Sequence, residues 1–185
     1  MLLEEPGFYS HLNGLENLSM LYEINHKFED LQKLSNYILI ISNNEYPTFR
    51  GNGIINNCII KKVIKGKDLK EKDKIRIYDL VAFWKTFGTS YLGGSTPLEI
   101  GNVYVVFLKK TTRANLSDSY VFTSVKYGHT IISKESKFLK NYLQNSMNIK
   151  EIRQYDYIFS NENTEVEIAE YLKIKADILK AVAEN

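Results

Sequence analysis

The stretch from residue 54 to residue 80 most constrains the fold, because it reads as a strand, a lysine-rich turn around Gly66 and a second strand. In the second strand, isoleucines alternate with basic residues between Lys74 and Ile77, as in a sheet that has one buried and one solvent-exposed face. Further on, the run LEIGNVYVVFLKK could pair with these strands. The three segments together predict a small, closed β-barrel.

Other apolar runs extend this pattern over residues 37–133. Residues 37–41 are short and rich in β-branched side chains, which favours a buried strand. Residues 103–108 are apolar on both faces and predict a central, covered strand. Strands around residues 120–122 and 130–132 are expected to meet at a hairpin turn near Gly128, where His129 would face solvent.

Helices are expected on both sides of this region. Asn13 is placed to cap a first helix, and the spacing of Phe28, Leu31 and Leu34 predicts a second. Ser133 could cap a helix that carries Phe138, Leu139, Tyr142, Leu143 and Met147. Thr164 opens a capping box, and the apolar stripe of the helix that follows is expected to face the core. That stripe consists of Ile168, Leu172, Ala176, Leu179 and Val182 or Ala183.

With 185 residues, 44% of them hydrophobic, the chain can bury one sizeable core. We expect an α+β fold: a five- or six-stranded, mainly antiparallel β-barrel of OB or netrin-like type, flanked by N-terminal and C-terminal helices. The expected parts are a helical segment at residues 1–36, the barrel at residues 37–133 and helices at residues 134–185, all in one compact domain. Aliphatic side chains should fill the barrel and leave no room for reactive groups.

Residues 37–133 resemble the netrin-like, tissue-inhibitor-type OB barrels of bacterial surface proteins. The matching segments are YILIIS, IKKVIKGKDLKEKDKIRI, NVYVVFLKK after a glycine, and SDSYVFTSVKYG. The resemblance implies a barrel. Metalloproteinase inhibitors of that fold act through an N-terminal cysteine held by disulfides, whereas this chain has one cysteine, Cys58, so the resemblance does not extend to that mechanism.

A second resemblance concerns residues 2–24, which look like the start of the helical subdomain in ABC transporter ATPases. The pattern combines Glu5-Pro6 and Tyr9 with a following Gly14-x-Glu16-Asn17-Leu18. The chain has no phosphate-binding loop of the form G-x-x-x-x-G-K-[ST]. The resemblance therefore implies no ATP hydrolysis, and a fused fragment and a chance match both remain open.

The sequence carries no recognisable catalytic set. Its histidines, His11, His26 and His129, lie far apart without carboxylates at ligand spacing, so we expect neither a metal nor a cofactor. Cys58 stands in an apolar run and is expected to be a buried, small hydrophobic residue. A net charge of +2 does not demand a nucleic-acid partner.

One segment is nevertheless strongly basic, since residues 61–76 hold eight basic and three acidic side chains. The candidate basic patch consists of Lys61, Lys62, Lys65, Lys67, Lys74 and Arg76. Lysines that follow a phosphate backbone beside aromatic rings would suit single-stranded nucleic acid on an OB barrel. The alternative is a solvated hairpin whose charges prevent edge pairing.

The long connection at residues 79–100 is the other candidate site. Trp84, Phe87 and Tyr91 could form an aromatic anchor for a partner, or fold back to plug one end of the barrel.

These observations together predict a non-enzymatic binding or interaction module of a bacterium, with a protein as the expected partner. The alternative is an OB-type protein that binds single-stranded nucleic acid through residues 61–76. No segment is long and apolar enough to span a membrane. We expect a cytoplasmic location for the chain as it stands, or the cell envelope if a leader precedes it.

Overall fold

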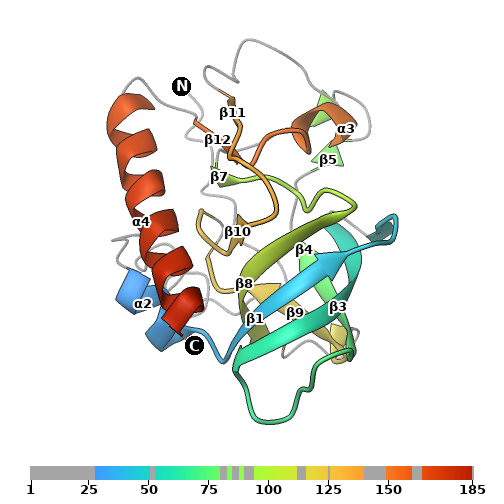
Figure 1. The fold of residues 1–185 in the computed structure, drawn as a ribbon. Helices are drawn as coiled ribbons and strands as arrows, with labels where there is room; N and C mark the ends of the chain where they lie inside the picture. Colours follow the sequence, from blue (N-terminus) through green and yellow to red (C-terminus); the bar gives the residue numbers. More distant parts are fainter. Residues whose placement is uncertain are drawn as a thin grey trace, which may run out of the picture.

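The computed structural model describes residues 28–50, 53–79, 83–84, 88–89, 94–111, 116–124, 126–139, 149–159 and 164–184 (Figure 1). Its helices are α2 (Phe28–Leu34), α3 (Ile149–Ile152) and α4 (Thr164–Glu184). The longer strands are β1 (Tyr37–Asn43), β3 (Gly53–Lys65), β4 (Lys74–Asp79), β8 (Asn102–Lys110) and β9 (Ser119–Phe122). The shorter strands are β2 (Thr48–Arg50), β5 (Phe83–Trp84), β6 (Gly88–Thr89), β7 (Gly94–Ser95), β10 (His129–Ile131), β11 (Phe138–Leu139) and β12 (Tyr157–Ile158).

The five longer strands close into a barrel in the order β1-β3-β4-β9-β8, and β8 pairs again with β1. All of these pairs are antiparallel except β4 with β9, which is parallel. Strand β2 adds to β3, and β10 adds to β8. The sequence prediction of a small, mainly antiparallel barrel in an α+β fold is therefore confirmed.

Alternation of side chains divides strand β8 between two cores, because successive residues of a strand point to opposite faces. In β8, Tyr104, Val106 and Leu108 fill the barrel interior. The intervening Val105 and Phe107 belong to a second core on the outside. The prediction of a central strand covered on both faces is thus correct.

The second core lies between the barrel and α4, which runs along one side of the molecule (Figure 1). Tyr171, Ile174 and Ile178 of α4 are buried there, together with Leu31 of α2. A small sheet of β11, β12 and β7 adds Tyr157 to the same cluster. This layer explains why β8 needs apolar residues on both faces.

The turn between β3 and β4 depends on Gly66. Its φ is +127°, a conformation that side-chain-bearing residues rarely adopt. A Cβ atom at this position would lie 2.6 Å from the ring of Tyr37. Glycine therefore lets the hairpin close against the first strand of the barrel.

The barrel interior differs from the expected purely aliphatic filling. Asn56 shares the inner face of β3 with Cys58 and is fully buried. His129, which was expected to face solvent in a turn, lies in β10 and is only 4% exposed. Its ring packs against Tyr104 and Phe122. The prediction for Cys58 is correct, because that side chain is buried.

The expected hairpin between residues 120–122 and 130–132 is wrong. Strands β9 and β10 do not pair with each other; both pair with β8, opposite different parts of it. Phe122 lies opposite Leu108, and His129 lies opposite Val106. The chain between them leaves the edge of β8 and returns to it, so β8 takes the place of the hairpin partner.

Two predictions for the C-terminal region also need correction. Phe138 and Leu139, expected on a helix, form β11, since they pair in parallel with Tyr157 and Ile158. In α4, the helix itself is confirmed, but only Ile168 and Val182 of the expected stripe pack against the core. Leu172 and Leu179 are exposed, whereas Ile174 and Ile178 face the core. Residues 1–27, with the predicted first helix and the ATPase-like pattern, lie outside the described residues.

Candidate functional site

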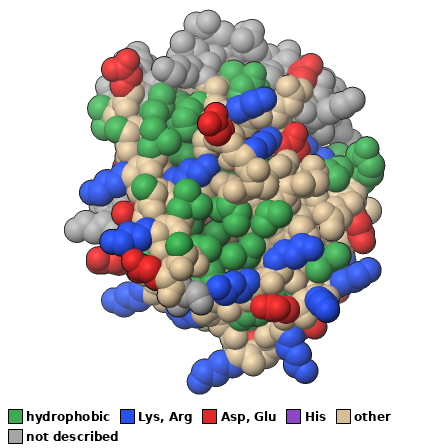
Figure 2. Space-filling model, viewed as in Figure 1, with side chains coloured by type: hydrophobic (Ala, Val, Ile, Leu, Met, Phe, Trp, Pro, Cys, Tyr) green, Lys and Arg blue, Asp and Glu red, His purple; other side chains and the backbone are tan. Residues whose placement is uncertain are grey.

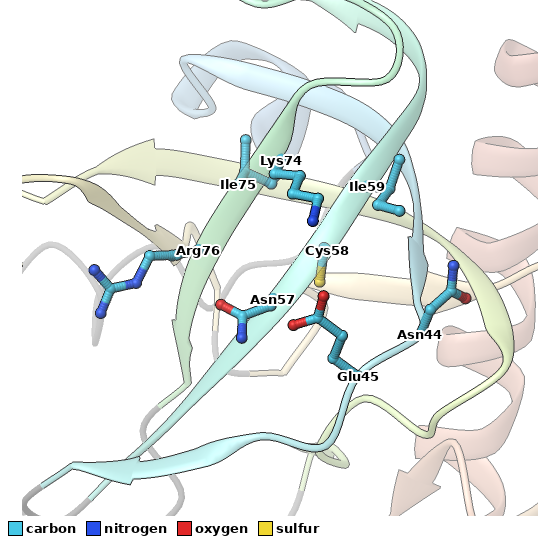
Figure 3. Close-up of a pocket in the computed structure, with 8 residues that line it drawn as sticks. All are labelled: Asn44, Glu45, Asn57, Cys58, Ile59, Lys74, Ile75 and Arg76. Atoms are coloured by element: carbon cyan, nitrogen blue, oxygen red, sulfur yellow. The ribbon is translucent and has the colours of Figure 1, made fainter.

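A hollow of about 340 Å³ lies on the outer face of β3 and β4, beside the loop that follows β1 (Figure 3). Its lining residues are Asn44, Glu45, Asn57, Cys58, Ile59, Lys74, Ile75 and Arg76. The side chains of Glu45 and Lys74 extend over β3 from opposite sides. The hollow thus combines a carboxylate, an ammonium group, an amide and apolar surface.

Cys58 is among the residues that line the hollow, but its side chain belongs to the barrel core and its thiol is not activated. Burial, with a smaller contribution from the negative charge of Glu45, raises its pKa from 9.0 to about 12. A thiolate is the nucleophilic form, and a raised pKa keeps the thiol protonated near neutral pH. Cys58 is therefore not a nucleophile near neutral pH.

Two exposed aromatic residues follow Glu45 of the hollow closely along the chain. Tyr46 follows Glu45 directly and is 85% exposed, and Phe49 in β2 is 64% exposed. Large exposed aromatics next to a concave surface are typical of binding sites. In the sequence analysis the segment SNNEYP was interpreted only as the end of a strand. Its tyrosine and the nearby phenylalanine, both in a polar stretch of sequence, were the signal for this site.

The structure separates the predicted basic patch into parts. Lys74 lines the hollow, and Arg76, two residues further along β4, forms an ion pair with Asp118. Lys65 instead donates a hydrogen bond to the carbonyl oxygen of Gln32, 2.8 Å away at the end of α2. Lys61 and Lys67 are exposed, and Lys62 is half-buried. Only Lys74 and Arg76 of the six therefore line the hollow.

The predicted aromatic anchor falls mostly outside the described residues. Phe87 and Tyr91 are not among them, and for Trp84 only the backbone is described, in β5 opposite Gly88. The anchor stays a prediction.

A second group of polar residues lies at one end of the barrel. Asp79 is the last residue of β4 and lies on the same inward face as Ile77. Burial raises the pKa of Asp79 from 3.8 to about 7, and the positive charge of Arg153 opposes this shift. Burial lowers the pKa of Arg153, and the charge of Asp79 opposes this shift. Among the described residues, Nε and Nη2 of Arg153 and both amide atoms of Asn56 have no hydrogen-bond partner.

His129 contacts the residue that follows β7 of the small sheet, and its contacts are those of a structural residue. Its Nε2 donates to the carbonyl oxygen of Thr96 at 2.7 Å, because a carbonyl can only accept. Burial lowers its pKa from 6.5 to about 4, so the ring is neutral at pH 7. Within the described ranges, no three His, Cys, Asp or Glu side chains come together at a distance that could hold a metal ion.

No protein-family model matches the sequence, and no curated protein matches it. In the part of the chain that the structure covers, none of the helices is long and apolar enough to cross a membrane.

Proposed function

We propose that this protein is a non-enzymatic binding module of a bacterium and that it holds a protein partner on the outer face of β3 and β4. The observation that carries the proposal is the pair of exposed aromatics on the segment that follows Glu45 of the hollow: Tyr46, the next residue, and Phe49 in β2. Aromatic side chains of this kind contribute most of the binding energy at many protein interfaces. The protonated thiol of Cys58 agrees with a role in binding rather than catalysis.

The strand order supports an OB-type assignment of the barrel. Numbered along the chain, the five barrel strands pair in the order 1-2-3-5-4-1, with the third and fifth parallel. This is the arrangement of OB barrels, which bind their ligands on the second and third strands and on the loop between the first two. In this chain those elements are β3, β4 and the loop that carries Tyr46, where the hollow lies.

The proposal is tested by photo-crosslinking in cells that express the protein natively. A photoreactive phenylalanine analogue replaces Tyr46 in one variant and Glu71, an exposed residue of the β3–β4 turn, in the control. We expect one protein adduct at position 46 that is absent from the control at position 71. That protein, once purified, should bind the unlabelled chain.

The matched variants decide the outcome of this binding measurement. Replacing Tyr46 and Phe49 together by alanine should weaken binding about tenfold or more, as loss of interface aromatics does. Replacing Glu71 by alanine should leave the affinity unchanged. Equal affinities of the wild type and the double variant would refute the proposal.

Single-stranded nucleic acid is the second candidate ligand, and the position of Lys74 and Arg76 favours it. Both line the same hollow as Glu45, which Tyr46 follows in the chain, so a base could stack on a ring while the lysine contacts a phosphate. Glu45 in the hollow and Asp118 beside Arg76 reduce this positive charge.

A fluorescently labelled oligothymidine distinguishes this second candidate. If it is correct, binding should weaken steeply as salt rises, because phosphate contacts release counterions. Lys74→Ala should reduce both the affinity and the salt dependence, and Lys67→Ala, in the exposed turn, should change them less. Absence of binding at low salt eliminates the candidate and leaves the protein-partner proposal standing.

A further inference from the structure

Part of the stripe of α4 that the sequence predicted to be buried is open to solvent, although Ile168 and Val182 of that stripe pack against the second core. Leu172 is 45% exposed and Leu179 is 39% exposed, although leucine is usually buried. Ala169, Ala176 and Ala183 are exposed as well. In the space-filling view, hydrophobic side chains lie along the visible side of α4 (Figure 2). The helix thus has one apolar side on the protein core and a second apolar side without a described partner.

These five residues follow a heptad pattern. The intervals from Ala169 to Leu172, Ala176, Leu179 and Ala183 alternate between three and four residues. Residues at this spacing form a straight seam, which in coiled coils packs against another helix. Because alanines alternate with leucines, a partner helix can approach closely at each alanine while its own side chains meet the leucines. We name these five residues the α4 seam.

The charged residues that flank the α4 seam are all lysines. Lys173 and Lys180 follow the two leucines on the outer flank and are exposed. On the inner flank, the one charged residue is Lys175, which donates a hydrogen bond to Ser136. The acidic Glu170, Asp177 and Glu184 lie one row further from the seam. Beside the five seam residues the nearest charges are therefore lysines, and Glu165, seven residues before Leu172, continues the line of the seam at its N-terminal end.

This charge pattern opposes pairing of α4 with a second copy of itself. An antiparallel pair would place Lys173 and Lys180 of one helix beside the same lysines of the other. A parallel pair would place them beside Lys175, Ile168 and Val182, which offer no negative charge. Both arrangements lack the opposite charges that coiled-coil helices use to choose a partner.

We propose that the α4 seam is a second interaction surface, independent of the hollow on β3 and β4, and that it docks an amphipathic helix of another protein. That helix carries leucine or isoleucine at heptad spacing, with carboxylates at the flanking positions that meet Lys173 and Lys180. The seam supplies apolar contact area, and the lysines select for the negative flank.

The proposal can be tested with the full-length chain and two synthetic peptides of about 20 residues, long enough to form a helix. Both peptides have leucine at heptad spacing; one has glutamates at the flanking positions, and the other has lysines. Fluorescence anisotropy should show that the glutamate peptide binds at least about tenfold more tightly than the lysine peptide at low salt. Replacing Lys173 and Lys180 together by glutamate should reverse this preference.

Two pairs of variants locate the surface. Leu172→Glu with Leu179→Glu should abolish peptide binding, and circular dichroism should show an unchanged fold because both residues are exposed. The control pair, Glu170→Gln with Asp177→Asn, lies one row away and should bind as the wild type does.

Several outcomes would overturn the proposal. Equal affinities for the two peptides would refute the preference for an acidic helix. Unchanged binding to the variant Leu172→Glu with Leu179→Glu would show that the peptide contacts another surface. A dimer that dissociates in those variants would assign the seam to a second copy. Peptide binding that occurs only in the double variant Leu18→Ser with Leu21→Ser would show that the seam is the docking site of residues 13–24 of the same chain.

Discussion

Asn56, Asp79 and His129 lie on inner faces of barrel strands, where the sequence pattern predicted aliphatic filling. Each of them stands in a strand at a position that alternation assigns to the interior. The side chain of a polar residue in a strand can be buried if a neighbour or water accepts or donates a hydrogen bond. His129 has such a partner in Thr96, and its neutral form fits the apolar surroundings. Alternation therefore identified the face, but not how the polar groups are satisfied.

Asp79 should make the protein less stable as the pH rises. The folded state raises the pKa of Asp79 from 3.8 to about 7, so it binds this proton more tightly than the unfolded chain does. The free energy of unfolding gained from this group is complete below pH 3.8 and is lost as the pH rises through about 7. Because His129 has the opposite pH dependence, the measurement uses the variant His129→Gln. Urea unfolding of this variant should show the free energy of unfolding falling across this pH range, and the additional substitution Asp79→Asn should abolish the fall.

His129 should have the opposite effect. The folded state lowers its pKa from 6.5 to about 4, so the neutral ring stabilises the fold above pH 6.5. That contribution is lost as the pH falls from 6.5 through about 4. In Asp79→Asn, where the opposing carboxyl is absent, urea unfolding should show stability decreasing toward acid. A flat curve in this variant would contradict the assignment.

At the level of elements, α4 shows how an amphipathic helix with two apolar sides can be misjudged. Leucines and alanines at heptad spacing indicate one side, and the buried Tyr171, Ile174 and Ile178 occupy another. Both sides satisfy helical periodicity, so hydrophobicity alone cannot choose between them. The barrel selects the side with the larger side chains, which fill the space over β8.

Adjacent residues of α4 provide a direct test of this orientation. Ile178→Ala should destabilise the protein by about 2–5 kcal/mol, because it removes a buried side chain and leaves a cavity. Leu179→Ala, on the exposed seam, should change the free energy of unfolding by less than ~1 kcal/mol. Urea unfolding of both variants measures the difference. Equal losses would show that the seam is buried in solution.

At the level of the whole molecule, β8 joins the two cores. It pairs with β1, β9 and β10, and its side chains enter both the barrel interior and the layer beneath α4. Strand β1 is similarly central, with β3 on one edge and β8 on the other. Loss of either strand would therefore open the barrel and expose both cores at once.

Native-state hydrogen exchange should reflect this central position. The amides of β1 and of the first half of β8 should exchange only through global unfolding, because both edges of these strands are paired. The amides of β2, whose three residues are all exposed, should exchange orders of magnitude faster. Protection of β2 equal to that of β8 would contradict this order of stability.

Local patterns in the sequence determined the barrel strands, the short helix α2, the capped helix α4 and the burial of Cys58. These features depend on alternation, turn residues and caps, which act between residues close in the chain. The sequence also identified residues 61–76 as the most basic segment, but it did not predict that the basic side chains of this segment would lie on separate parts of the surface. That outcome depends on Lys65 reaching α2 and Arg76 reaching Asp118.

Only the tertiary structure decided which strands pair, which side of α4 is buried and where the binding surfaces lie. Residues 120–131 followed a hairpin pattern, yet β8 binds both of their strands. Tyr46 and Phe49 gained significance only when the structure showed them exposed on the segment that follows Glu45 of the hollow. The physical reason is the same in each case: the choice depends on contacts between residues far apart in the chain, and local periodicity carries no information about them.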